Sequence, residues 1–175
     1  MNTQDLRSIQ APLKERYRAA PEAALITLHA NGRIGDGLTC KVETGRALVE
    51  AGLHPRTGGT GLSACSGDML LEALVACAGV TLNAVATALG IDLRDATVQA
   101  AGDLDFRGTL GVAKDAPVGF QNIRLQFTLD TDATDEQVAT LLRLTERYCV
   151  VYQTLAQPPA LSAVCMRAGT PPPHP

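Results

Sequence analysis

The apolar residues of the chain are concentrated in one continuous stretch, residues 67–90, which reads GDMLLEALVACAGVTLNAVATALG. It is apolar on almost every side of a helix, and Gly90 suits the position just after a helix C-terminus. The stretch is long enough to raise the question of a membrane span, but Asp68, Glu72 and Asn83 interrupt it. We therefore predict a buried helix at the centre of a soluble domain.

Alternating polar and apolar residues predict strands on both sides of this helix. Before the helix, residues 25–34 and 38–43 flank a G-D-G turn that favours a hairpin, and residues 47–50 add a third strand. After the helix, residues 97–106 and 122–130 alternate in the same way. Strands before and after one central helix indicate an α+β domain in which antiparallel sheet covers the helix.

Two amphipathic helices complete the pattern. Residues 3–19 read as a helix with a break or a second start at Pro12. Thr134 and Gln137 have the spacing of a capping box, which opens a helix with an inward-facing stripe. The stripe consists of Val138, Leu141, Leu142, Thr145 and Cys149.

We treat residues 1–175 as a single domain. Residues 1–22 form an N-terminal helical extension, and residues 169–175 are a proline-rich tail. Between the last helix and the tail, residues 160–167 are predicted to form a final strand, and residues 107–121 a loop rich in glycine and proline.

Composition narrows the classes of function. Hydrophobic residues make up 46% of the chain and charged residues 19%, more apolar than a soluble monomer needs, so we expect a subunit interface. The net charge is −3, aromatic residues are 3% and tryptophan is absent, which excludes a nucleic-acid-binding surface. The N-terminus has no signal sequence, so we expect a cytoplasmic protein that does not bind membranes.

The chemistry-bearing residues are the five cysteines, Cys40, Cys65, Cys77, Cys149 and Cys165. They form no C-x-x-C pair and lie far from the three histidines, so we expect neither a metal nor another cofactor. Free cysteines of this kind are either inert packing or redox groups. A thiol buried in mid-helix, such as Cys77, is unreactive unless a cationic partner stabilises its thiolate.

Three blocks of sequence resemble the OsmC/Ohr family of thiol-dependent peroxidases and together span about half the chain. They are D-M-L-L-E-A-L-V-A-C ending at Cys77, then D-F-R-G-x-L-G followed by P-x-G-F in residues 105–120, and E-R-Y-C-V-V-x-x-T-L in residues 146–155. The resemblance implies an OsmC-like fold, an α+β intertwined homodimer with active sites at the subunit interface. It also implies reduction of organic hydroperoxides, with a dithiol of the cell as reductant.

Carried over by position, Cys77 is the peroxidatic cysteine that becomes a sulfenic acid, and Cys149 is the resolving cysteine that forms a disulfide with it. The resemblance also implies an arginine that activates Cys77, for which Arg33 is our choice and Arg56 the alternative. Asp68 matches the position of the carboxylate that orients the arginine. Its spacing from Cys77 places it on the opposite face of the helix, so a helix N-cap is the alternative role.

Two departures from the family pattern leave open which branch of the family the chain resembles and how fast it turns over. Val150 follows Cys149 where the family commonly has proline, and Ala78 follows Cys77 where the Ohr branch commonly has an aromatic residue. The missing proline, together with Asp68 where some relatives have glutamate, motivates an alternative function. It is a binding module of the same fold that holds an apolar small molecule and whose thiols are vestigial or sensing.

Overall fold

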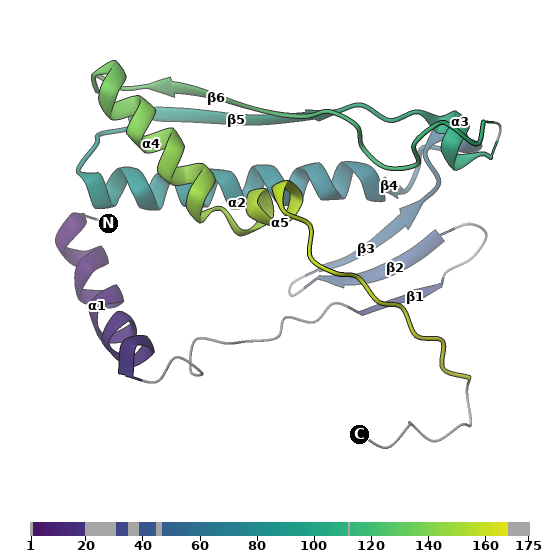
Figure 1. Ribbon diagram of the computed structural model, residues 1–175, viewed down its shortest axis with the longest axis horizontal. Coiled ribbons are helices and arrows are strands. Elements are labelled where there is room, and N and C mark those ends of the chain that lie inside the picture. Colours follow the sequence, from purple (N-terminus) through teal and green to yellow (C-terminus); the bar gives the residue numbers. More distant parts are fainter. Residues whose placement is uncertain (1, 20–30, 35–38, 45–46, 112, 168–175) are drawn as a thin grey trace.

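The computed structural model describes residues 2–19, 31–34, 39–44, 47–111 and 113–167. A long central helix, α2, lies beneath the two-stranded sheet β5–β6, with α4 and α5 beside it (Figure 1). A four-stranded sheet lies at one end of α2 and α1 lies at the other. The elements are α1 (Thr3–Ala19), β1 (Asn31–Ile34), β2 (Thr39–Thr44), β3 (Ala47–Gly52), η2 (Pro55–Thr57), β4 (Ala64–Cys65), α2 (Ser66–Leu89), β5 (Asp95–Gly102), α3 (Phe106–Thr109), β6 (Ile123–Asp130), α4 (Asp135–Tyr148) and α5 (Val150–Ala156).

The central helix confirms the prediction made from the apolar stretch. Its fully buried side chains follow the four-residue spacing of one helix face, and they are Leu74, Ala78, Leu82 and Ala86. Gly90 ends the helix with a φ of 70°, a left-handed conformation that glycine adopts without strain. By length and composition α2 could cross a membrane, but one face packs on β5, α4 and α5. The opposite face exposes Ala73, Ala76 and Val80.

The sheet over α2 consists of β5 and β6, paired antiparallel from Asp95↔Asp130 to Gly102↔Ile123. Side chains along the strands alternate between the two faces of the sheet. The inner face packs on the core through Val98, Ala100, Ile123, Leu125 and Phe127. The predicted strand over residues 97–106 is wrong at its end. Because Asp105 accepts a hydrogen bond from the Arg107 N–H, it caps α3, which begins at Phe106.

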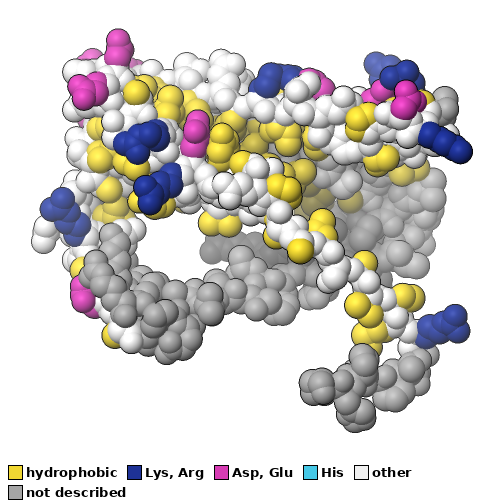
Figure 2. Space-filling view, in the orientation of Figure 1, with side chains coloured by type: hydrophobic (Ala, Val, Ile, Leu, Met, Phe, Trp, Pro, Cys, Tyr) yellow, Lys and Arg dark blue, Asp and Glu magenta, His cyan; other side chains and the backbone are white. Residues whose placement is uncertain are grey.

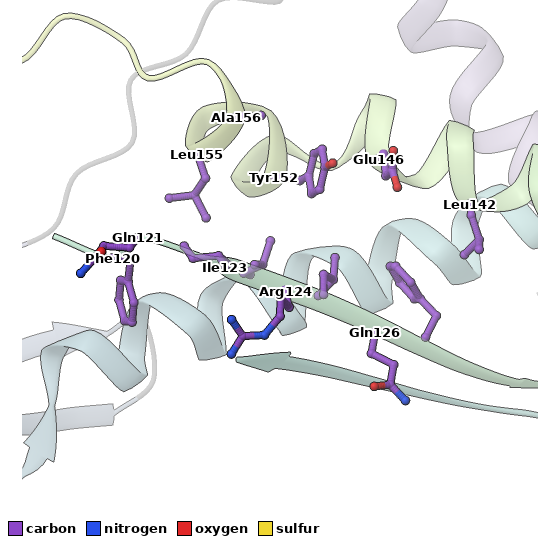
Figure 3. Close-up of a pocket in the computed structure, with 13 residues that line it drawn as sticks. Phe120, Gln121, Ile123, Arg124, Gln126, Leu142, Glu146, Tyr152, Leu155 and Ala156 are labelled. Carbon is purple, nitrogen blue, oxygen red and sulfur yellow. The ribbon is translucent and has the colours of Figure 1, made fainter. Parts of the chain in front are cut away.

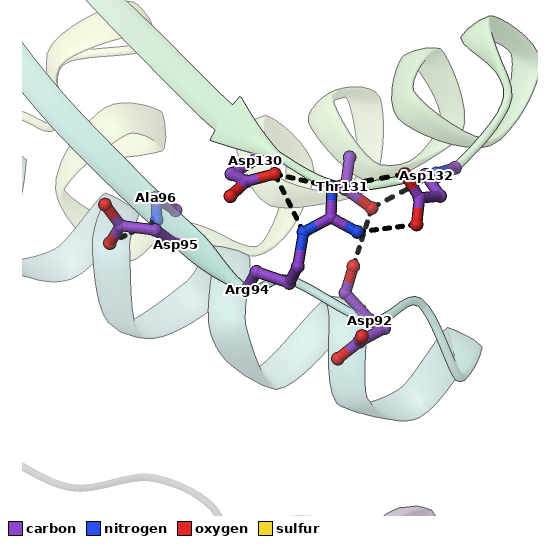
Figure 4. A network of polar contacts seen from close by, with 8 residues as sticks. Asp92, Arg94, Asp95, Ala96, Asp130, Thr131 and Asp132 are labelled. Atoms are coloured by element: carbon purple, nitrogen blue, oxygen red, sulfur yellow. Dashed lines mark hydrogen bonds and ion pairs between the residues drawn. The ribbon is translucent and has the colours of Figure 1, made fainter.

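A cluster of charged residues links the start of β5 to the end of β6 (Figure 4). The Arg94 guanidinium pairs with Asp130 at 2.6 Å and with Asp132 at 2.5 Å, and the Arg94 N–H donates to the Asp130 carbonyl oxygen. All three side chains are largely exposed, so the pairs fix the geometry of the strand ends and contribute little to stability.

The other sheet has the strand order β1-β2-β3-β4, antiparallel except for the β3–β4 pair. It confirms the predicted hairpin over residues 31–34 and 39–43, and the predicted third strand. The rest of the predicted hairpin, residues 25–30 and 35–38, lies outside the described residues.

Two predictions about the ends of the chain are wrong. The first helix, α1, continues from Thr3 to Ala19 through Pro12, where a break or a second start was predicted. Residues 160–167 form no strand, because no described strand pairs with them, and Leu161 and Val164 are exposed. The C-terminal segment instead extends away from the body of the molecule (Figure 1).

The predicted capping box at the start of α4 is confirmed. The Thr134 hydroxyl accepts from the Gln137 N–H at 3.3 Å, and the Gln137 side chain accepts from the Thr134 N–H at 2.9 Å. We expect Thr134→Ala to lower the free energy of unfolding by about 1 kcal/mol, because a first-turn donor loses its acceptor. Urea unfolding at fixed protein concentration measures the loss. Thr134→Ser retains the cap and should stay within a few tenths of a kcal/mol of the parent; an equal loss in both variants would contradict the prediction.

Candidate active site

The first predicted thiol, Cys77, lies at the middle of α2 and is partly buried. It packs against a cluster of three buried residues, Leu74, Ala78 and Cys149. The regular helix fixes its direction, since Leu74 and Ala78 flank Cys77 along the face that contacts the sheet and α5. The structure therefore brings Cys77 to Cys149, which follows α4.

The second thiol, Cys149, is 1% exposed and lies between two helices. Its backbone is extended, with φ −73° and ψ 108°, so α4 ends before it and α5 begins after it. Its sulfur accepts a hydrogen bond from the Tyr152 N–H at 3.5 Å and so caps the start of α5. This role as a cap holds the Cys149 thiol in a fixed position beside α2.

The environment of the two sulfurs separates their acidities. Burial raises the pKa of the Cys77 thiol, but hydrogen bonds from the Val151 N–H, the Cys149 thiol, the Val150 N–H and the Thr81 hydroxyl outweigh burial and lower it below the ordinary value. Burial raises the pKa of Cys149, and the neighbouring Cys77 raises it further. At neutral pH Cys77 is thus the better nucleophile and Cys149 remains protonated.

The cationic side chain that we expected beside Cys77 stays a prediction, because the side chain of Arg33 is outside the described residues. Among the described residues, the donors that lower the pKa of Cys77 are uncharged. The sequence reasoning missed them because it did not predict α5. The sequence does contain a signal for α5, because Tyr152 and Leu155 have the three-residue spacing of one helix face. In the structure both side chains pack on the core.

Two of the predicted charged residues, Arg56 and Asp68, line a cavity of about 400 Å³ at the start of α2, together with His54 and Cys65. The described lining residues of this cavity do not include Cys77. Asp68 is exposed in the first turn of α2, and the N-cap is Cys65, so the predicted N-cap role of Asp68 is wrong.

Arg33, the preferred activator, lies in β1, where its backbone is opposite Lys41 of β2. Its side chain is outside the part of the chain that the structure describes. The choice between Arg33 and Arg56 therefore stays a prediction.

A larger cavity of about 810 Å³ adjoins the thiol cluster (Figure 3). Leu155 of α5 and Ile123 of β6 point toward each other across it, with Tyr152 above, while Arg124 points away to pair with Asp103. The cavity shares Leu74, Tyr152 and Leu155 with the residues packed around the two cysteines. Figure 2 shows hydrophobic side chains gathered in this hollow between β6 and the helices α4 and α5. Its volume suits a small apolar molecule.

A long helix beneath an antiparallel sheet, with two thiols in contact between helices, defines an α+β protein with a candidate thiol site. Residues 59–163 match the family described as OsmC-like protein, so the chain belongs to that family. A comparison with curated proteins gives no match to this chain.

Solved structures share the fold at low sequence identity. An OsmC-like protein from Mycoplasma pneumoniae has a TM-score of 0.64 and 14% identity, and the match covers 76% of this chain and 89% of that one. The organic hydroperoxide resistance protein OsmC from Legionella pneumophila has a TM-score of 0.60 and 17% identity, covering 77% and 92%. The organic hydroperoxide resistance protein OhrB of Bacillus subtilis has a TM-score of 0.52 and 19% identity, covering 77% and 94%. The predicted OsmC-like α+β fold is confirmed.

Proposed function

We propose that the protein is a thiol-dependent peroxidase that reduces organic hydroperoxides through Cys77 and Cys149. The observation that carries the proposal is the contact between two thiols whose pKa values shift in opposite directions, lowered for Cys77 and raised for Cys149. The names of the Legionella and Bacillus proteins, which refer to organic hydroperoxide resistance, support the same class of substrate.

The chemistry proceeds in three balanced steps. The Cys77 thiolate attacks the terminal peroxide oxygen, so an S–O bond forms and the O–O bond breaks. The leaving alkoxide takes up the proton that Cys77 lost on ionisation and departs as the alcohol. Cys149 then attacks the sulfur of the sulfenic acid, forming the disulfide and releasing water. A dithiol of the cell reduces the disulfide by thiol–disulfide exchange and is itself oxidised.

The cavity beside the thiols supplies the binding part of the mechanism. Its wall includes Leu74, Ile123, Leu125, Phe127 and Leu155, which favour an apolar organic group over hydrogen peroxide itself. A bulky hydroperoxide that places its alkyl or aryl group among these side chains brings the O–O bond toward Cys77. We infer from this lining that binding becomes tighter as the organic group becomes larger.

The remaining parts of the proposal concern the assembly. The face of α2 opposite its buried residues exposes Ala73, Ala76 and Val80, and it supports a homodimer in which this apolar face is covered. In the dimer, Arg33 would complete the site and Asp68 would orient it. The protein would act in the cytoplasm. Sedimentation at micromolar concentration tests the assembly, and a monomer would remove this part of the proposal.

The reaction predicts a defined stoichiometry. One equivalent of cumene hydroperoxide added to the reduced protein should consume two thiols and yield a disulfide between the peptides that contain Cys77 and Cys149. Thiol titration and peptide mass spectrometry measure both results. In a parallel sample, Cys165→Ser removes an exposed thiol and should leave the pairing unchanged. Two free thiols in intact, peroxide-treated protein would refute the mechanism.

A second function remains because the cavity of about 810 Å³ is large enough to bind an apolar small molecule without any reaction. In that case the parent would not turn over hydroperoxide, and a Cys77→Ser variant would bind an apolar fluorescent probe as tightly as the parent. Turnover that depends on Cys77 would exclude this binding-module function.

A further inference from the structure

The larger cavity, beside the thiols, has two charged side chains of opposite sign in its otherwise apolar or uncharged wall. Among the described residues of the lining, they are Arg124 of β6 and Glu146 of α4. A charge at the wall of a cavity acts more strongly on a bound molecule than the same charge does in bulk water, because the surrounding protein has a lower dielectric constant. The balance between these two charges therefore affects which charged molecules the cavity binds.

The positive charge of Arg124 is compensated within the protein. Both terminal nitrogens of its guanidinium donate to the Asp103 carboxylate, one at 2.5 Å and the other at 2.7 Å. The guanidinium also points away from the cavity (Figure 3). An anionic ligand would have to displace the Asp103 carboxylate from a bidentate pair, so Arg124 offers it little attraction.

The negative charge of Glu146 has no such partner among the described residues. Glu146 follows Leu142 by one helical turn on the face of α4 that lines the cavity, and it lies between Leu142 and Tyr152 in Figure 3. The ion pairs of the described residues do not include its carboxylate. Arg147, the next residue, lies over a tyrosine ring instead, and Arg143 is not among the described lining residues. The described lining therefore has one uncompensated negative charge.

We propose that Glu146 makes the cavity selective by charge, so that it takes hydroperoxides with a neutral or cationic organic group and disfavours those with a free carboxylate. The inference deepens the proposed function and rests on it for the peroxide, whereas the selection by charge acts equally on unreactive ligands. The arginine proposed to complete the site does not cancel the charge of Glu146, because it pairs with the Cys77 thiolate. Glu146 is thus a residue that determines specificity, beside an apolar wall that is indifferent to charge.

The test compares octylammonium, octanamide and octanoate, which have the same number of carbon atoms and differ in charge at neutral pH. Each ligand competes with Nile red, a neutral fluorescent dye, for the reduced full-length protein at low ionic strength. We expect the Kd of octanoate to exceed that of octylammonium by about tenfold, with octanamide between them. Octanamide has no charge, so it reports any change in the apolar part of the cavity.

Two variants with the same change of net charge locate the effect. Glu146→Gln removes the carboxylate from the lining, and it should reduce the ratio of the octanoate Kd to the octylammonium Kd to about two. Glu136→Gln removes an exposed carboxylate from the first turn of the same helix, outside the described lining, and should keep the ratio within a factor of two of the parent.

Three outcomes would overturn the inference. They are a ratio near one in the parent, a ratio that Glu146→Gln leaves unchanged or that both variants lower equally, and a failure of all three ligands to displace the dye. The measurement uses no peroxide and no reaction of a thiol. A lack of peroxide turnover would therefore refute the proposed function and leave the charge selection by Glu146 standing.

Discussion

Cys77→Ala should lower kcat/KM for organic hydroperoxide reduction by on the order of 10³-fold or more, because it removes the atom that attacks the O–O bond. The fold should be retained, since alanine replaces a small, partly buried side chain that is flanked by Leu74 and Ala78 on the same helix. Consumption of cumene hydroperoxide in the presence of a dithiol measures the loss.

Two matched variants separate the role of Cys77 from a general loss of thiols. Cys65→Ala removes the partly buried thiol at the other cavity and should retain nearly all activity. Cys149→Ala should reduce one equivalent of peroxide and then stop, leaving a sulfenic acid on Cys77 that a 1,3-diketone can trap. Activity in Cys77→Ala within a factor of ten of the parent would show that another group is the nucleophile.

The parts of the fold that the sequence predicts well are those determined by local patterns. The helix α2 follows from an uninterrupted apolar stretch ended by Gly90, and β6 from strict alternation between Ile123 and Asp130. The capping box at Thr134 is recognisable because the bonding groups are only three residues apart. In each case the forces that form the element act within a few residues.

The elements that the sequence does not predict depend on contacts between distant residues. Residues 160–167 are predicted as a strand, but hydrogen bonding along a strand requires a partner that no described strand provides. Phe106 continues the alternation of β5 yet begins α3, because Asp105 caps that short helix and Phe120 packs closely over Gly102. Local alternation cannot predict such long-range packing.

The candidate site is predictable to a similar extent. Inward-facing positions on two helices placed Cys77 and Cys149 on the same core, and the structure brings them into contact. Which groups set their pKa values was not predictable, because the backbone donors come from a helix that begins only after Cys149 breaks α4. Side-chain chemistry can be read from a sequence more readily than the direction of main-chain N–H groups.

The second large effect that we predict is a loss of stability, caused by a change in the core beside the C-terminal half of α2. Leu141 of α4 has no exposed surface and packs against Leu82 and Ala86 of α2. Leu141→Ala should lower the free energy of unfolding by about 3 kcal/mol, because the lost transfer free energy adds to that of a cavity among side chains that relax only partly. Urea unfolding followed by circular dichroism at a single protein concentration measures the change.

Leu62→Ala makes the same chemical change at a leucine that is 92% exposed, and it should alter stability by less than about 0.5 kcal/mol. The cavity left by Leu141→Ala lies among Leu82, Ala86 and Leu129, and the fully buried residues of this cluster are not those of the cysteine cluster, although Val98 and Phe127 pack against both. The pH midpoint for alkylation of Cys77 by iodoacetamide should therefore stay at its parent value while the protein is folded. Equal losses of stability in the two leucine variants would show that α4 does not pack on α2 as described. A leucine side chain stabilises the fold more than an exposed one only where it is closely packed by its neighbours.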